Sequence, residues 1–271
     1  FAYDPEILKE ILKRSWPIAL GIVFNLIYLK ADTIILSLTR SQTEVGIYGA
    51  GFRILEVLIT IPMMILGLLL PQFTKAWAEK NLVYWKQLYQ KTYDLIHIIV
   101  WPLALGGIVI SAPLIHLIAG KEFSQSIPIL QILLLALIGI FLSTLFGHLI
   151  VSMNLQKQAV WSYGITAFFA LLFYLMVIPY FSFWGAALIT FGAEVGIAII
   201  LYVFVGKETS FFPKQRFAIT SLIAAGGMFA ILLLLNTPWI IEIAIGVVLY
   251  ALFLLILLHM TPKTFITYFK L

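Results

Sequence analysis

The chain has 271 residues, of which 62% are hydrophobic and only 11% are charged. Soluble domains carry about 25% charged residues, so this chain has too little charge to cover the surface of a water-soluble fold. The composition excludes an ordinary soluble enzyme, a disordered tail and a nucleic-acid-binding protein, although the formal net charge is +5. With no cysteine, the chain also has no disulfide framework and no thiolate metal site.

Eight stretches of the sequence are long and apolar enough to span a membrane, which takes roughly 20 residues each. Lipid offers no hydrogen-bond partner to backbone polar groups, so the prediction is an all-α, polytopic transmembrane helix bundle. The predicted spans are Trp16–Leu38, Val45–Leu70, Leu95–Ala119, Ile127–Ser152, Ala159–Tyr180, Trp184–Val205, Phe217–Leu235 and Trp239–His259.

The cationic residues outside these spans are divided unequally between the two sides of the membrane. Thirteen of the 17 Lys and Arg residues fall on the side of the N-terminal end, and only Arg40 and Lys121 fall on the other. Cytoplasmic loops carry the excess of Lys and Arg. We therefore predict that both ends of the chain are cytoplasmic, with anionic inner-leaflet lipids as partners of these cations.

The segments between the spans suggest how the chain is organised. Residues 1–14 form a cytoplasmic or interfacial lead-in, 15–206 hold six spans, and 207–271 hold two further spans and a short cytoplasmic tail. Residues 74–91 predict an amphipathic helix in the membrane interface, or alternatively a solvated connecting helix. The aromatic and apolar residues behind this prediction are Trp77, Tyr84, Trp85 and Leu88.

Polar residues inside the spans are few and they cluster. In the first span Asn25, Tyr28 and Asp32 are spaced by three and seven positions, so they share one helical face. Lys30 lies two positions from Asp32 and points elsewhere. Ionisable residues within a membrane are costly, so they usually face a partner or a cavity.

The second span carries a similar stripe. Arg53, Glu56 and Thr60 again lie at offsets of three and seven, and Tyr48 lies near them on the same predicted helix. Two consecutive spans thus both carry polar stripes that include charges of both signs.

Two interpretations of these stripes remain open. Lys30–Asp32 and Arg53–Glu56 could be internal ion pairs that hold the helices in register. Alternatively, the residues line a hydrophilic cavity in which a cation meets an anionic substrate. The second interpretation is favoured because a single ion pair would be enough to hold two helices in register, whereas here two adjacent spans both carry polar stripes.

Two more ionisable residues are candidates for ion or proton coupling. Glu194 lies near the middle of the sixth span, between Gly192 and Gly196, and such a Gly-x-x-x-Gly motif commonly packs helices closely. It is either hydrogen-bonded across a tight helix crossing or a cavity-lining, proton-coupling carboxylate. His148 in the fourth span is either a proton carrier or a hydrogen-bonded packing residue.

Motifs of catalysis are absent from the sequence. It contains no His-Glu-x-x-His, no phosphate-binding loop, no Gly-x-Ser-x-Gly and no Cys/His ligand set. Paired carboxylates in a loop, which a metal-dependent enzyme acting on lipid phosphates would need, are also lacking. The sequence therefore predicts a protein that is not an enzyme and that needs no metal and no cofactor.

Three motifs resemble a known family. Ser15–Gly21 with Lys30–Ile35 resembles the seventh span, and Val45–Glu56 the eighth span, of the O-antigen and polysaccharide flippases. Ile178–Thr190, followed by Glu194, is similar to the signature of their eleventh and twelfth spans. These flippases belong to the multidrug/oligosaccharidyl-lipid/polysaccharide exporter superfamily, whose members have two six-helix lobes around a central cavity.

The resemblance implies a function and a set of partners. It implies that the chain is a fragment, the second lobe plus two extra helices, which lacks an N-terminal lobe as its partner. The whole transporter would flip polyprenyl-pyrophosphate-linked oligosaccharide repeat units across the bacterial inner membrane by alternating access. Further implied partners are membrane lipids, a polysaccharide polymerase and a chain-length regulator, and no nucleic acid.

The resemblance also suggests roles for the polar stripes. Arg53, helped by Lys30, would hold the pyrophosphate or an acidic sugar, because a guanidinium suits phosphate geometry. The remaining members would contact sugar hydroxyls or tune these cations; they are Asn25, Tyr28, Asp32, Tyr48 and Glu56. Glu194 and His148 would serve in coupling.

Two other functions stay open at this stage. One is a cation-coupled multidrug exporter of the same superfamily, which would favour an acidic cavity. The other is a membrane protein that transports nothing, such as a scaffold or an integral enzyme of lipid-linked sugar assembly.

Overall fold

The computed structural model describes residues 5–235 and 237–269, apart from the side chains of 7, 13, 14, 17, 18, 25, 28 and 29. Within these residues the chain is helical and contains no strand, which confirms the all-α prediction. The helices are α1 (Pro5–Thr39), α2 (Gln42–Ala78), α3 (Leu82–Val109), α4 (Ser111–Ile118), η1 (Lys121–Phe123), α5 (Ser126–Ser152), α6 (Gln156–Thr209), α7 (Arg216–Leu232), α8 (Trp239–Leu258) and α9 (Pro262–Phe269).

Five of the described helices, α2, α3, α5, α6 and α8, are long and apolar enough to cross a membrane, and α7 is a shorter apolar helix. The chain is therefore a multi-pass membrane protein. The predicted first span lies within α1, and two predicted spans lie within α6. The total of eight spans stays a prediction.

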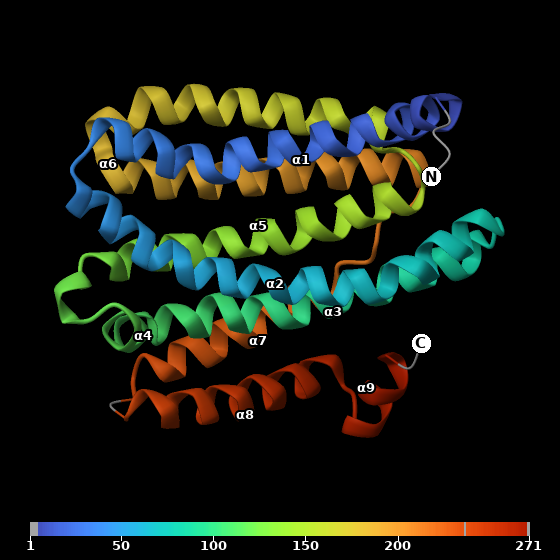
Figure 1. The fold of residues 1–271 in the computed structure, drawn as a ribbon. Helices are drawn as coiled ribbons and strands as arrows, with labels where there is room; N and C mark the ends of the chain where they lie inside the picture. Colours follow the sequence, from blue (N-terminus) through green and yellow to red (C-terminus); the bar gives the residue numbers. More distant parts are fainter. Residues whose placement is uncertain (1–4, 236, 270–271) are drawn as a thin grey trace.

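The helices pack side by side as a bundle (Figure 1). α1 lies along α6, α2 along α5, and α3 packs against both α5 and α7, while α8 pairs with α7 at the edge. α1 begins and α9 ends at the same end of the bundle, and the turn between α1 and α2 lies at the other (Figure 1). This arrangement leaves α1 and α2 as neighbours that touch mainly near their turn.

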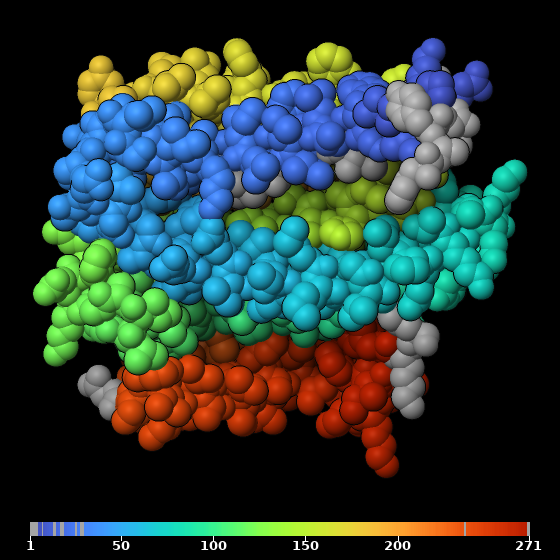
Figure 2. Space-filling view, in the orientation of Figure 1, coloured from blue at the N-terminus to red at the C-terminus, as the bar shows by residue number. Residues whose placement is uncertain are grey.

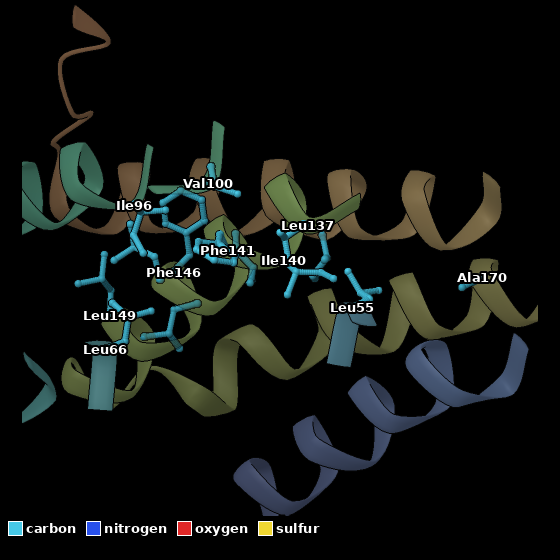
Figure 3. Close-up of a cluster of buried hydrophobic side chains, with 14 of the residues drawn as sticks. Leu55, Leu66, Ile96, Val100, Leu137, Ile140, Phe141, Phe146, Leu149 and Ala170 are labelled. Atoms are coloured by element: carbon cyan, nitrogen blue, oxygen red, sulfur yellow. The ribbon is translucent and has the colours of Figure 1, made fainter. Parts of the chain in front are cut away.

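The core is centred on α5, which contacts α2, α3 and α6. Figure 3 shows side chains of α5 meeting Leu55 and Leu66 of α2 on one side and Ile96 and Val100 of α3 on another. The labelled α5 residues in this cluster are Leu137, Ile140, Phe141, Phe146 and Leu149. α5 is thus the helix around which the others are positioned.

The crossing of α5 and α6 depends on a glycine. A Cβ on Gly139 would lie 2.6 Å from the carbonyl carbon of Glu194 and 2.8 Å from the nitrogen of Val195. Only a residue without a side chain permits such a backbone approach. The prediction that Gly192 and Gly196 make the tight crossing is wrong, since no atom lies within 4 Å of a Cβ built on either.

α6 is broken near its middle. Its 54 residues would extend about 80 Å as one straight helix, far more than the ~30 Å of a bilayer core. Ser182 adopts φ 50° and ψ −136°, outside the helical region, and Pro179 lacks an N–H for the preceding turn. The two halves fold back on each other at this point (Figure 1).

The prediction of a single interfacial helix over residues 74–91 is wrong. α2 ends and α3 begins within this segment, because Lys80 adopts a left-handed conformation with φ 56° and the side chain of Asn81 caps α3. Trp85 is fully buried and packs edge-on against Trp77 at 5.5 Å between ring centroids. These aromatic residues hold a helix–helix corner together.

The predicted third span, Leu95–Ala119, also differs from the structure. α3 ends at Val109 and α4 starts at Ser111, with Ile110 between them. Pro113 has no N–H to offer the carbonyl of Val109, so the helical ladder is interrupted there. α4 consequently forms a separate short helix beside α5.

Candidate functional site

The polar stripes of α1 and α2 meet through an ion pair between the two helices. The amine of Lys30 bonds the carboxylate of Glu56, and the same nitrogen lies 4.8 Å from the centre of the Phe52 ring. The Lys30 and Glu56 side chains are 47% and 46% exposed. The ion pair joins α1 to α2 away from the turn between them. Figure 2 shows a recess between these two helices, in which atoms of α5 are visible.

The ion pairs considered from the sequence alone, Lys30–Asp32 and Arg53–Glu56, do not form. Asp32 turns inward and is fully buried, whereas Lys30 turns to the other helix. Two helical residues that are two positions apart point about 200° away from each other around the helix axis. Lys30 and Asp32 therefore occupy different faces of α1.

Asp32 is the centre of a buried hydrogen-bond network. Its carboxylate accepts bonds from the Tyr48 hydroxyl of α2, from the backbone N–H of Thr33 at 2.5 Å, and from the Thr190 hydroxyl of α6 at 3.2 Å. Thr33 also brings its hydroxyl to 3.2 Å. A buried carboxylate is tolerated only with several such donors.

Thr190 extends this network across the break in α6. Its hydroxyl lies 2.9 Å from the hydroxyl of Tyr174, which belongs to the other half of α6, and 2.9 Å from the carbonyl of Ala186. Tyr48, Tyr174 and Thr190 are all buried. The network therefore joins α1, α2 and both halves of α6. Its four buried side chains, that of Asp32 included, lie between these helices and are not exposed at the surface.

Arg53 lies at the edge of an apolar groove. It is exposed, and no hydrogen bond or ion pair joins it to any other part of the chain that the structure describes. The groove has a volume of about 870 Å³ and contains a second charged residue, Glu242 of α8. Its apolar wall comes from α2, α3, α4, α5, α7 and α8, and includes Leu58, Leu103, Leu134, Met228, Val247 and Tyr250.

The two coupling candidates have different surroundings. Glu194 is buried one helical turn after Thr190, with the polar Ser143 side chain of α5 near its carboxyl group. His148 is half-buried, and its Nδ1 lies 2.8 Å from the carbonyl oxygen of Thr144 on its own helix. The geometry thus connects Glu194, and not His148, to the region of the Asp32 network.

The predicted residues fall into three places. Asp32 and Tyr48 are in the buried network, Lys30 and Glu56 form the bridge between α1 and α2, and Arg53 borders the groove. The side chains of Asn25 and Tyr28 lie outside the described residues.

Sequence reasoning missed Thr190 as a partner of Asp32 and Tyr174 as the partner of Thr190 in the same network. Thr190 had one available signal, its spacing of four from Glu194. Tyr174 had none, because its contact depends on how α6 folds back. Among the described residues, no group of three or more His, Asp or Glu side chains could hold a metal ion.

Comparison with known proteins agrees with the motifs. Residues 2–128 match the model of a family described as polysaccharide biosynthesis protein. The stretch around Ile178, which also contributed to the resemblance, lies beyond the matched residues. A search of curated proteins finds no match.

The fold is similar to that of a solved flippase, the lipid II flippase MurJ in its inward closed conformation. The TM-score is 0.79 at 16% sequence identity, and the match covers 94% of this chain and 56% of that one. The chain thus spans little more than half the length of the structure it matches. The expected resemblance is confirmed: residues 2–128 match the polysaccharide biosynthesis family, and the chain shares the fold of a lipid flippase.

Proposed function

We propose that this chain is part of a transporter that flips polyprenyl-pyrophosphate-linked oligosaccharide repeat units across the bacterial inner membrane for surface polysaccharide biosynthesis. The family match and the flippase fold support a lipid-linked substrate. The observation that carries the proposal is the placement of Arg53, an exposed cation without an ion pair in the described chain, beside a large apolar groove.

A cation beside an apolar groove fits a substrate that has an anionic headgroup and a long apolar tail. A guanidinium offers paired donors that match phosphate oxygens. The tail gains little free energy when it leaves lipid for an apolar groove, because both surroundings are hydrocarbon. The groove would therefore guide the tail, while Arg53 and Lys30 bind the headgroup as it crosses about 30 Å of membrane.

The charge distribution favours this substrate over a cationic drug. A drug exporter would present unpaired carboxylates to its cargo. Here Asp32 and Glu194 are buried inside the bundle, Glu56 is paired with Lys30, and Glu242 shares the groove with Arg53. Efflux of cationic dyes without any effect on surface polysaccharide would support the drug exporter instead. Transfer of glycan by the purified protein would support an enzyme.

Coupling would use Glu194. It is buried, lies near the polar Ser143 side chain of α5, and is one turn from Thr190 of the Asp32 network. A proton taken up there could alter how α5 and α6 pack. In this proposal, the polysaccharide polymerase and the chain-length regulator receive the flipped unit outside the membrane.

The decisive experiment substitutes Arg53 in the intact protein. Loss of a charged hydrogen bond costs about 1.5–3 kcal/mol, so Arg53→Ala should reduce flipping of a fluorescent lipid-linked oligosaccharide in proteoliposomes by roughly 10- to 100-fold. Lys75→Ala, which removes an exposed cation near the other end of α2, is the matched control and should leave flipping unchanged. Normal flipping by Arg53→Ala would refute the assignment.

A further inference from the structure

The ion pair between Lys30 and Glu56 has the features of a contact that a ligand can replace. Both side chains are about half exposed, and they join α1 to α2. A half-exposed ion pair is held less firmly than a buried one, so an incoming anion can compete with Glu56 for Lys30. A bound anion of higher charge would compensate for the loss of Glu56 at Lys30.

No other carboxylate in the described chain competes for Lys30. Asp32 is nearer in sequence, but its oxygens already accept bonds from Tyr48, Thr33 and Thr190 in the interior. Glu56 therefore alone occupies the place beside the Lys30 amine that an anionic headgroup would need. The Phe52 ring, 4.8 Å from the Lys30 nitrogen, fixes the amine in this position.

We propose that Glu56 is a built-in competitor for the substrate: it neutralises Lys30 in the empty transporter, and the substrate's diphosphate displaces it. This inference rests on the proposed function. A neutral or singly charged headgroup displaces the carboxylate poorly, because Lys30 attracts it no more strongly than it attracts Glu56. Glu56 therefore sets a threshold of headgroup charge, and it excludes abundant membrane lipids with weakly charged headgroups.

The displacement also gives substrate binding a mechanical consequence. Lys30 and Glu56 connect α1 to α2 beyond the turn that joins these helices. A ligand shifts a conformational equilibrium only if it makes different contacts in the two states. Replacing a bond between two helices with a bond between one helix and the ligand is such a difference, and it frees α1 to move relative to α2.

The test is equilibrium binding to the intact protein in nanodiscs of phosphatidylcholine, with a polyprenyl diphosphate that carries no sugar as the probe. Glu56→Gln should bind the diphosphate about two- to fivefold more tightly, as expected for the loss of a competitor worth up to ~1 kcal/mol. The preference for diphosphate over the corresponding monophosphate should fall in the same variant. Glu79→Gln, which removes an exposed carboxylate paired with Lys75 on the same helix, should change neither.

A second pair of variants separates local competition from a general effect of charge. Lys30→Met should weaken binding of the diphosphate, and adding Glu56→Gln to Lys30→Met should no longer tighten it. If Glu56→Gln tightens binding equally in both backgrounds, or does not tighten it in the wild type, the competitor role is refuted while the proposed function stands. If the wild-type protein does not bind the diphosphate at all, both proposals fail.

Discussion

The guanidinium of Arg40 donates a 2.6 Å hydrogen bond to the carbonyl oxygen of Pro179, 139 positions further along the chain. Its Nε lies 3.4 Å from the carbonyl oxygen of Ile178. The break at Ser182 leaves these carbonyls without the partners that a continuous helix would supply. The short turn between α1 and α2 thus completes the hydrogen bonding of a broken helix that is remote in sequence.

Arg40→Ala should therefore destabilise the fold at the break in α6. We expect the free energy of unfolding to fall by about 1.5–3 kcal/mol, the range for hydrogen bonds that involve a charged group. Thermal unfolding of the purified protein in detergent would measure it. Lys121→Ala, which removes an exposed cation at the same end of the bundle, should have little effect, and equal melting temperatures for the two variants would contradict the prediction.

Gly139→Ala should be severely destabilising. The new Cβ would lie 2.6 Å from the backbone of Glu194, and a backbone cannot turn aside as a side chain can. Overpacking of this kind costs about 1–3 kcal/mol or more. Gly192→Ala makes the same chemical change where nothing lies within 4 Å, so its melting temperature should match the wild type.

Tyr48→Phe should cost more stability than Tyr174→Phe. Removing the Tyr48 hydroxyl takes a donor directly from the buried Asp32 carboxylate, at a cost of about 1.5–3 kcal/mol. The Tyr174 hydroxyl bonds the neutral Thr190 hydroxyl at 2.9 Å, and losing a hydrogen bond between two neutral groups should cost about 0.5–1.5 kcal/mol. Thermal unfolding of both variants decides this, and the opposite order would show that Asp32 is not the centre of the network.

Filling the groove should impair transport without unfolding the protein. Val247 and Ile256 both lie on α8 and are 65% and 64% exposed, but only Val247 lines the groove. Val247→Trp should therefore slow flipping of a long-chain substrate severalfold, while Ile256→Trp leaves the rate unchanged. Flipping assays with both variants would measure this, and an equal rate for both would show that the substrate tail does not use the groove.

Much of the helical architecture could be predicted from the sequence, because hydrocarbon thickness fixes the length of an apolar helix. Ala159–Tyr180 and Trp184–Val205 fall on either side of the break at Ser182. The predicted helix boundaries were wrong where a capping residue or a proline, and not the hydropathy, determines where a helix starts or ends. These residues are Asn81, which caps α3, and Pro113, which interrupts the third predicted span.

The partners within the candidate site were harder to predict. Spacing correctly placed Asp32 on a different face of α1 from Lys30, but it could not show that Tyr48 and Thr190 bind Asp32 and leave Lys30 for Glu56. Those contacts come from helices that are distant in sequence, and a single sequence carries no information on such pairings. The crossing glycine was misassigned for the same reason, since Gly139 acts through a residue 55 positions away.

Helices α7 and α8 form a pair with its own hydrophobic core. Phe217 and Met228 of α7 pack with Tyr250 and Leu254 of α8, and they form a cluster separate from the main one. The pair joins the bundle chiefly along α3, where the Tyr250 hydroxyl bonds the carbonyl of Ile98 at 2.8 Å. Evolution could therefore append, exchange or delete this pair as a module, altering the groove wall while the interior that holds Asp32 keeps its contacts.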